Sequence, residues 1–425
     1  MAKSFIPVAS EHHFPIQNIP FGTGIKPGDS LPRCVSRLGD FAVDLKELEN
    51  QGFFADVLPH PVFQGSFLND FMSLSRTQWV GVRGKLQHLL SEDTPTLRDN
   101  QELRQAVLVP IENFTSTLPV QIGDYTDFYA SKNHAFNVGS MFRGPENALQ
   151  PNWTRLPVGY HGRASSIVIS GHPVRRPRGQ VKPPDASEPL FTASKRVDYE
   201  LEMAFFVGGK VNELGETIDV NEARESIFGL ALLNDWSARD LQAWEYVPLG
   251  PFNAKNFIST ISPWIVTLEA LEPFKQSLPA QDPQPLPYLN ETDHSSYNIR
   301  LDSLIKTPSM EAPHKISESN MLYLYWSITQ QLAHHTESGC NLRVGDMMGT
   351  GTISGPDQSS LGCLLELTWA GKNPIELPSG EKRTFLEDGD ELILTGACTG
   401  EGYTIGFGEV VSKVTPALQD KYFHN

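Results

Sequence analysis

The sequence predicts a mainly β protein with a few helices, made of a small N-terminal domain and a larger C-terminal domain. Three observations lead to this prediction. The chain has 425 residues, more than one compact core usually contains. Its 34 glycines and 32 prolines interrupt it at short intervals. Between these breaks lie short apolar or alternating runs of strand length, and helical periodicity is rare.

The N-terminal domain is predicted to span residues 1–118. It reads as short strands and turns followed by one helical stretch from Thr77 to Leu90, where apolar residues recur at helical spacing. Gly81 and Gly84 weaken that pattern. The polar run from Ser91 to Gln101 is expected to be a surface connection.

The C-terminal domain, residues 119–425, contains the clearest strand patterns. These runs are Ser166–Ser170, Leu201–Val207, Ile261–Thr267 and Glu391–Gly396. Asp388-Gly389, just before the last run, predicts a hairpin turn.

One helix and one loop are also predicted in this domain. The helix runs from about Ser319 to His335, and Gly339 is a plausible stop. Its apolar face comprises Leu322, Tyr325, Trp326, Thr329 and Leu332. The segment from Gln276 to Asn298 is rich in Pro, Ser and Asp and is expected to be a surface loop.

Charge excludes two classes of partner. Lys and Arg number 34 against 50 Asp and Glu, a formal net charge of −16. Such a chain lacks the basic face that nucleic acids and anionic membrane surfaces require. The longest useful apolar run, Ile227–Leu233, is far shorter than the about 20 residues of a membrane span. We therefore expect no nucleic acid and no membrane as partners.

Cysteine usage and the N-terminus favour a cytoplasmic protein. Cys34, Cys340, Cys363 and Cys398 lack paired metal-type spacing and are too few for a disulfide framework. Residues 1–24 lack the apolar core of a signal peptide. A reducing compartment is therefore expected.

An acidic stretch gives the first indication of a functional site. Glu200 and Glu202 lie in a segment of strand character, where side chains two residues apart share a face. Neighbouring carboxylates on a half-buried face repel each other unless a cation lies between them. An isolated E-x-E pattern is also typical of a solvated strand edge, so this pair alone leaves both interpretations open.

Two further acidic motifs favour the metal site. One is the stretch 124–129, which contains Asp127, and the other contains Asp235 and directly follows an apolar run. If these residues converge with the glutamate pair, four carboxylates without Cys or His favour Ca²⁺, Mg²⁺ or Mn²⁺ over Zn²⁺. Lys255 and Arg239 could offset the remaining negative charge.

Long motifs of low degeneracy extend along the whole chain. They include SFIPVASEHHFPIQNIPFG, QIGDYTDFYASKNHAFNVGSMFRG, LPVGYHGRASSIV, YELEMAFFVG, NDWSARDLQAWEYVPLGPF, GTISGP and, near the end, GYTIGFG. On these motifs the chain resembles the fumarylacetoacetate hydrolase family. With its N-terminal module it resembles the full-length enzyme rather than the shorter hydratases, decarboxylases and pyruvate hydrolases of the superfamily.

The resemblance implies an SH3-like N-terminal barrel, a β-roll catalytic domain and a homodimer. It also implies hydrolysis of the carbon–carbon bond of 4-fumarylacetoacetate to fumarate and acetoacetate, the last step of tyrosine and phenylalanine catabolism. The implied cofactor is Ca²⁺ and/or Mg²⁺, and the implied partner is a small dicarboxylate substrate.

The resemblance further implies a role for each site residue. The metal positions are Asp127, Glu200, Glu202, Asp235, Lys255 and Ser259; Ser259 is often Thr in relatives. The catalytic positions are His134, the base that activates water, Glu366, which orients it, and Arg239, Gln242 and Lys255. The substrate-contacting positions are Tyr129, Arg143, Tyr160, Gln242, Tyr246 and Thr352.

The chemistry accounts for these residue types. Cleavage beside a carbonyl needs a base for water and positive charge for the oxyanion and the enolate. Histidine titrates near neutral pH, and arginine can hold a carboxylate bidentately. Gly349 and Gly351 are expected to let the backbone approach the ligand. An ordinary partly exposed or packed histidine remains the interpretation for His88, His314, His334 and His335.

Two alternatives stay open at this point. The same fold and metal could serve the hydration or decarboxylation of a 2-oxo acid, which product analysis distinguishes from hydrolysis. A non-enzymatic scaffold would be favoured by a missing base or a broken metal shell, and the sequence retains both.

Overall fold

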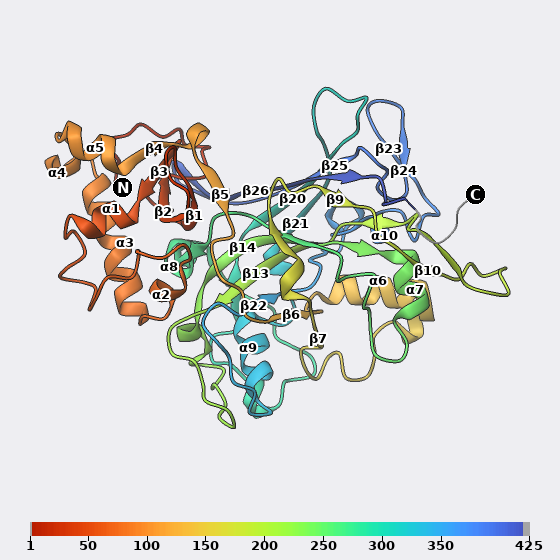
Figure 1. Cartoon of the computed structure of the whole chain (residues 1–425). Coiled ribbons are helices and arrows are strands. Elements are labelled where there is room, and N and C mark those ends of the chain that lie inside the picture. Colours follow the sequence, from red (N-terminus) through yellow and green to blue (C-terminus); the bar gives the residue numbers. More distant parts are fainter. Residues whose placement is uncertain (1, 420–425) are drawn as a thin grey trace.

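The computed structural model describes residues 2–419, and strand predominates over helix. Figure 1 shows an N-terminal module at the left, formed by elements β1 to β5, and a larger part that contains the remaining sheets. The predicted mainly β fold with an N-terminal domain is confirmed. Within the described residues, no helix has the length and apolar character needed to cross a membrane.

The N-terminal module is built on an antiparallel sheet in the order β4-β3-β2-β1-β5. Its strands are β1 (Phe21–Ile25), β2 (Arg33–Leu38), β3 (Phe41–Asp44), β4 (Leu108–Pro110) and β5 (Thr115–Thr117). Its helices are α1 (Leu45–Asn50), α2 (Asn69–Met72), α3 (Arg76–Leu90), α4 (Pro95–Arg98) and α5 (Gln101–Val107). A small five-stranded antiparallel sheet agrees with the SH3-like barrel that the resemblance implies.

Helix α3 confirms the predicted helical stretch, and its inner face buries Trp79, Leu86 and Leu90. The expected surface connection at 91–101 is not a plain loop. It contains α4, which begins at Pro95, because proline suits the first helical position, where no N–H donor is needed.

The central sheet of the larger part has the order β7-β6-β22-β13-β14-β16-β8, with β17 also paired to β14. Its strands are β6 (Tyr125–Phe128), β7 (Gly159–His161), β8 (Ile167–Ile169), β13 (Leu201–Val207), β14 (Ile227–Asp235), β16 (Ser259–Ile261), β17 (Val266–Thr267) and β22 (Met347–Gly349). The strand predicted from Ile261 to Thr267 is interrupted between β16 and β17, where Pro263 cannot donate a ladder hydrogen bond.

Strands β13 and β14 are buried along their whole length because the central sheet is covered on both faces. Phe206 and Ala231 belong to the hydrophobic core of the N-terminal module. Phe205 and Leu230 belong to the core of the larger part. Because successive side chains of a strand point to opposite faces, neighbouring residues of β13 and of β14 pack into two different cores.

A second sheet packs against the central one, and β25 and β26 contact β14. Its order is β21-β20-β25-β26-β9. The strands are β9 (Val174–Arg175), β20 (Arg300–Lys306), β21 (His314–Asn320), β25 (Glu391–Gly400) and β26 (Tyr403–Thr415). The two curved sheets agree with the β-roll that the resemblance implies.

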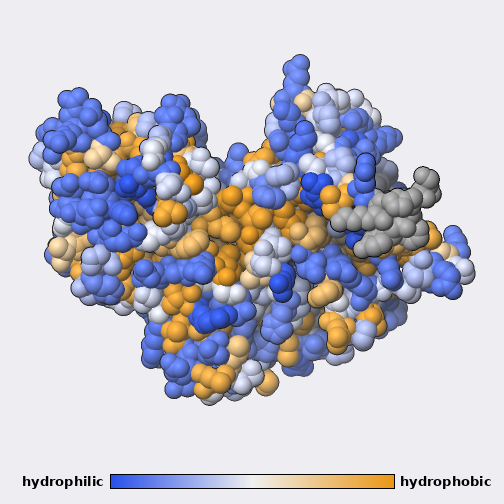
Figure 2. Space-filling model, in the orientation of Figure 1, coloured by the Kyte–Doolittle hydropathy of each residue, from blue (hydrophilic) through white to orange (hydrophobic). Residues whose placement is uncertain are grey.

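Short strand pairs and helices complete the larger part. The pairs are β10 (Arg178–Val181) with β11 (Leu190–Ala193), β12 (Val197–Asp198) with β15 (Ser237–Ala238), β18 (Lys275–Ser277) with β19 (Ser295–Tyr297), and β23 (Ile375–Glu376) with β24 (Lys382–Arg383). The helices are α6 (Lys132–Arg143), α7 (Arg239–Glu245), α8 (Leu268–Leu271), α9 (Ile328–Thr336) and α10 (Leu364–Leu367). On the face shown in Figure 2, apolar side chains gather in the hollow between the N-terminal module and the lobe at the upper right.

The helix predicted from Ser319 to His335 is wrong in its first half. The chain up to Asn320 belongs to β21, and Ser319 donates its hydroxyl to the carbonyl of Ile353 at 2.7 Å. Helix α9 begins only after Ser327, whose hydroxyl accepts from the N–H of Gln330 at 3.1 Å. Apolar residues continue from β21 into α9 because the strand and the helix each bury one face in the same core.

Two smaller predictions also need correction. The segment 276–298, predicted as a loop, pairs its two ends as β18 and β19. The turn at Asp388-Gly389 exists, with φ of 95° at Gly389. It is not a hairpin, because β25 pairs with β20 and β26 and not with the strand before the turn.

Phe228→Ala tests the shared packing of the two parts. The ring of Phe228 lies 5.1 Å from Trp79, 5.7 Å from Phe71 and 5.9 Å from Phe21, measured between ring centroids. We expect the free energy of unfolding to fall by about 3–5 kcal/mol in urea denaturation, because a large buried ring is lost. Leu214→Ala, at a side chain 79% exposed, is the control and should change it by less than about 0.5 kcal/mol. Equal effects would contradict the shared core.

Candidate active site

A pocket of about 520 Å³ lies beside strands β6 and β13 and helices α6 and α7. Most of the predicted site residues line it: Asp127, Tyr129, His134, Arg143, Tyr160, Glu200, Glu202, Arg239, Gln242, Tyr246, Lys255 and Thr352. The other predicted residues, Asp235, Ser259 and Glu366, are not part of this lining. Asp235 and Glu366 bond the lining residues Tyr160 and His134, and Ser259 bonds Asp235. The structure thus brings all the predicted residues to one region.

The strand order explains how the carboxylates meet. Asp127 lies on β6, Glu202 on β13 and Asp235 at the end of β14, while Glu200 directly precedes β13. Carboxylate oxygens of these four residues all lie within 4.8 Å of one another. The predicted convergence of two acidic motifs with the E-x-E pair is therefore present as geometry.

Gly349 makes this approach possible. It lies on β22, between β6 and β13, opposite Asp127 on one side and Ala204 on the other. A Cβ at this position would lie 2.7 Å from Oδ1 of Asp127 and 3.0 Å from Oε2 of Glu202. Any larger residue would push the two carboxylates away.

The next glycine serves the same cluster through its backbone. The N–H of Gly351 donates to Oε2 of Glu202 at 3.0 Å, and its φ of 77° lies in the left-handed region that favours glycine. Both glycines therefore support the carboxylates directly, whereas the sequence suggested an approach to the ligand.

The four carboxylates are buried, and the pKa values of Asp127, Glu200 and Glu202 are shifted in different directions. Burial, and then the negative charges of the neighbouring carboxylates, raise the pKa of Asp127 and of Glu202 well above the ordinary range. Burial also acts to raise the pKa of Glu200, but Lys255 and Arg239 outweigh it and bring that pKa to about 2. Oδ1 of Asp127 and Oε1 of Glu202 have no hydrogen-bond partner among residues 2–419. Buried carboxylate oxygens without partners are suited to a hard cation.

Lys255 and Ser259 surround this cluster from the side of Asp235. The ammonium of Lys255 pairs with Glu200 and lies 2.7 Å from Oδ2 of Asp235. Burial lowers the pKa of Lys255, but the two carboxylates outweigh burial and raise it overall. Lys255 therefore brings a positive charge next to two of the four carboxylates. The hydroxyl of Ser259 donates to Oδ1 of Asp235 at 3.2 Å.

A histidine–carboxylate pair lies at the other side of the pocket. Nδ1 of His134, on α6, lies 2.6 Å from Oε2 of Glu366, on α10. Burial acts to raise the pKa of Glu366, but His134 and the other donors hold it below its ordinary value. An ionised carboxylate can only accept, so Nδ1 of His134 carries the proton and Nε2 is the nitrogen left for the pocket.

Glu366 is held by donors that the sequence analysis did not identify. The amide of Asn137 donates to its Oε1 at 2.8 Å, and the hydroxyl of Ser354 donates to its Oε2 at 2.7 Å. Asn137 could have been found, because it lies three residues after His134 on the same helical face. Ser354 lies in the GTISGP motif, but nothing local in that motif indicates its partner.

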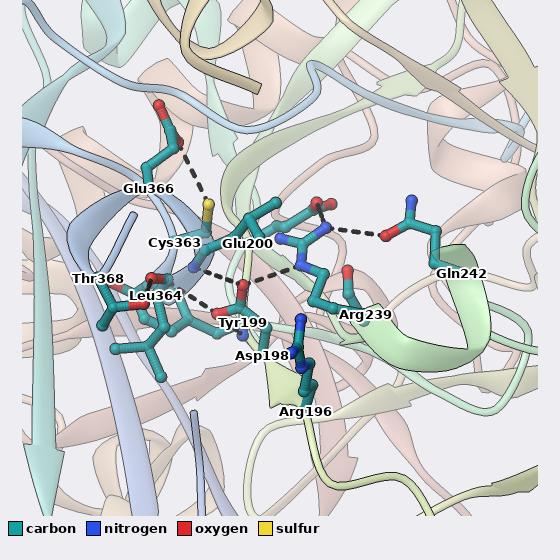
Figure 3. A network of polar contacts seen from close by, with 12 residues as sticks. Arg196, Asp198, Tyr199, Glu200, Arg239, Gln242, Cys363, Leu364, Glu366 and Thr368 are labelled. Atoms are coloured by element: carbon teal, nitrogen blue, oxygen red, sulfur yellow. Dashed lines mark hydrogen bonds and ion pairs between the residues drawn. The ribbon is translucent and has the colours of Figure 1, made fainter. Parts of the chain in front are cut away.

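Arg239 links the carboxylate cluster to further polar groups, as Figure 3 shows. Its Nη1 donates to Oε1 of Glu200 at 2.8 Å and to Oε1 of Gln242 at 3.2 Å. Its Nε donates to Oδ2 of Asp198 at 2.9 Å. Nη2 of Arg239 has no hydrogen-bond partner in the described part of the chain. The guanidinium thus keeps one buried donor group without a partner among the described residues.

The residues predicted to contact substrate differ in their surroundings. Tyr160 donates its hydroxyl to Oδ2 of Asp235 at 3.0 Å, which places it in the carboxylate cluster. Thr352 is buried, and within residues 2–419 its hydroxyl has no partner. Arg143 is anchored to the carbonyls of Asn147 and Ala148 at 3.1 and 2.6 Å. These groups give the pocket hydroxyl and cationic donors for a polar ligand.

Sequence comparisons find related proteins that match nearly the whole chain. A family described as "Fumarylacetoacetate (FAA) hydrolase C-terminal" matches residues 124–415, and one described as "Fumarylacetoacetase N-terminal" matches residues 17–119. Fumarylacetoacetase of Dictyostelium discoideum is 53% identical over 420 residues, which cover 98% of both chains. Human fumarylacetoacetase is 52% identical over 417 residues, which cover 98% of this chain and 99% of the relative.

Solved structures agree at the level of the fold. A fumarylacetoacetate hydrolase from Exiguobacterium antarcticum superposes with a TM-score of 0.51 at 15% identity and covers 94% of this chain and 99% of that one. A maleylpyruvate hydrolase from Sphingobium superposes with a TM-score of 0.50 at 14% identity and covers 94% of this chain and 100% of that one.

Glu202→Gln tests whether the cluster holds a cation. With a chelator present, we expect the variant to melt at a higher temperature than the wild type, because it has less charge repulsion. With Ca²⁺ or Mg²⁺ added, its melting temperature should rise less, since each tenfold loss of affinity removes about 1.4 kcal/mol of binding free energy. Calorimetry measures both effects.

Glu376→Gln, at an exposed residue of β23, is the matched control. It should behave as the wild type under both conditions. If the cation raises the melting temperature of Glu202→Gln as much as that of the control, Glu202 is not a ligand.

Proposed function

The chain belongs to the fumarylacetoacetate hydrolase family, and we propose that it hydrolyses the carbon–carbon bond of 4-fumarylacetoacetate to fumarate and acetoacetate. It is a hydrolase, and relatives that are about half identical over 98% of its length are fumarylacetoacetases. One observation supports the activity most directly. A single pocket presents a carboxylate cluster, a histidine–carboxylate pair and two cationic side chains. This reaction is the last step of tyrosine and phenylalanine catabolism.

His134 is the general base of the proposed reaction. Its Nε2 takes a proton from water, and the water oxygen attacks the carbonyl carbon beside the bond to be cleaved. Glu366 holds the Nδ1–H, which fixes the tautomer and stabilises the imidazolium that forms. The carbon–carbon bond then breaks, and its electron pair leaves with the acetoacetate fragment as an enolate, which takes up a proton.

Positive charge is required where the oxyanion and the enolate develop. Arg239 and Lys255 line the pocket, and Arg239 retains an unused donor group. Gln242 holds the guanidinium of Arg239 from the pocket side at 3.2 Å. Arg143, Tyr129, Tyr160, Tyr246 and Thr352 supply the donors that a dicarboxylate substrate needs.

A divalent cation completes the proposed site. Asp127, Glu200, Glu202 and Asp235 would hold Ca²⁺ and/or Mg²⁺, with Lys255 and Ser259 around them. Such an ion supplies Lewis-acid polarisation of the substrate's oxygen atoms. The unpartnered oxygens of Asp127 and Glu202 support this assignment.

The oligomeric state and the domain boundary are further parts of the proposal. We place the boundary between residues 118 and 119, after β5 and before β6. We expect a homodimer, because large apolar side chains are exposed close together in sequence at the end of α7 and directly after it, and they also gather in the hollow seen in Figure 2. The exposed residues of that segment are Trp244, Tyr246, Val247, Leu249 and Phe252.

We also propose a cytoplasmic location. The cysteines at 34, 363 and 398 are buried free thiols, and Cys340 is a partly exposed free thiol. Free thiols of this kind are compatible with a reducing compartment.

The activity is tested with purified protein and fumarylacetoacetate. We expect its absorbance to decay with equimolar release of fumarate and acetoacetate, and a chelator should stop the reaction and lower the melting temperature. A single product, or release of CO₂, would replace hydrolysis by the hydration or decarboxylation of a 2-oxo acid.

His134→Ala tests the base. We expect kcat to fall by about 10²- to 10⁴-fold, because general base catalysis contributes this much. Circular dichroism and calorimetric cation binding should stay as in the wild type. His334→Ala is the control, because His334 lies on α9, bonds Tyr288 at 3.1 Å and does not line the pocket. Loss of cation binding in His134→Ala would count against the assignment of His134 as the base.

A further inference from the structure

We propose that Asp198 is a positioning residue that couples the carboxylate cluster to the His134–Glu366 pair, an inference that rests on the proposed function. Asp198 ends β12 and is fully buried. It does not line the pocket, so it acts only through the groups that it holds. Figure 3 shows it between Arg239 on one side and the segment of Leu364 and Glu366 on the other.

On the first side, Asp198 fixes the direction of Arg239. Its Oδ2 accepts from Nε of Arg239 at 2.9 Å, and the opposite edge of the guanidinium reaches Glu200 at 2.8 Å. Because the guanidinium is planar, a bond at Nε sets the positions of Nη1 and Nη2. Asp198 thereby keeps Nη1 on a carboxylate of the cluster.

On the second side, Asp198 anchors the helix that carries Glu366. Its Oδ1 accepts from the N–H of Leu364 at 2.8 Å, and its Oδ2 accepts from the N–H of Leu365 at 2.9 Å. These are the first two residues of α10, whose N–H groups have no partner within the helix. Glu366 is the next residue, so this anchor sets the distance between its carboxylate and His134.

Only a carboxylate can serve both sides. With the N–H of Tyr199 at 2.9 Å, each oxygen of Asp198 receives two donors. The carboxylate is fully buried, and these four donors satisfy both of its oxygens. In Asp198→Asn, the amide nitrogen must face two donors in either orientation, so one of the two bonds to α10 is always lost, and in one orientation the bond to Arg239 is lost as well.

Asp198→Asn is the main test, carried out on the full chain with Ca²⁺ or Mg²⁺ present. We expect kcat to fall by about 10- to 100-fold with KM little changed, because the loss of a residue that orients site side chains has effects of this size. In the Glu366→Gln background the same change should cost much less, since residues that act as a unit are not additive.

A second measurement is independent of turnover. In the wild type, the Nδ1–H proton of His134 is held in a bond of 2.6 Å to Glu366 and should give a low-field proton NMR signal. The signal is assigned by its loss in His134→Ala. In Asp198→Asn we expect this signal to shift or disappear.

Asp390→Asn is the matched control. Asp390 is equally buried, accepts from Nε and Nη2 of Arg383 at 2.8 and 3.0 Å and binds the N–H of Glu387 at 2.8 Å, yet it does not line the pocket. We expect this control to lower the melting temperature while kcat and the NMR signal stay as in the wild type.

The outcomes separate the two proposals. If Asp198→Asn only lowers the melting temperature, as the control does, Asp198 is a structural residue and the inference is wrong. If that variant does not fold, Asp198→Glu decides, because it keeps the charge but displaces the carboxylate from α10, and it should show the same kcat and NMR changes. If the wild type releases no fumarate and acetoacetate, the proposed function fails, and the NMR signal still decides the role of Asp198.

Discussion

Repulsion among buried carboxylates is the constraint on which the rest of the site depends. Four buried carboxylates have oxygens that lie within 4.8 Å of one another. Lys255 and Arg239 stabilise Glu200, and Lys255 also stabilises Asp235. Asp127 and Glu202 keep oxygens without partners among residues 2–419, and their raised pKa values express the same imbalance. The site therefore has the charge and the geometry to attract a hard dication, and the two cations beside the cluster, Lys255 and Arg239, are already engaged with carboxylates.

The protein tolerates this unfavourable arrangement because the strands that carry the carboxylates are tightly packed. The two central strands that carry Glu202 and Asp235 are buried on both faces, so neither can move without disturbing two cores. Gly349 removes the side chain that would otherwise separate the carboxylates. The carboxylate cluster is therefore held by the sheet, whereas the His134–Glu366 pair is held by helices α6 and α10.

The sequence predicted the members of the site better than their supports. Glu200 and Glu202 could be placed on one face because strand periodicity is local. His134 lies in one of the long motifs, and Glu366 was assigned from the resemblance alone. The neighbourhood of β6 and β13 could not be predicted, because β22 joins them and comes from a distant part of the chain. The same limit applies to Asp198 and Ser354, whose partners are set by tertiary contacts. Around Ser319 the apolar pattern was misleading, because a strand and a helix share one core there.

The packing of Phe228 against Trp79 has a consequence for damage far from the pocket. One face of the central sheet packs into the core of the N-terminal module, so the module stabilises the strands that bear the acidic residues. A destabilising lesion among the first hundred residues would weaken this packing while leaving every reacting group chemically intact. Cells that carry such a lesion would hold fewer working molecules, because quality control removes chains that open too often.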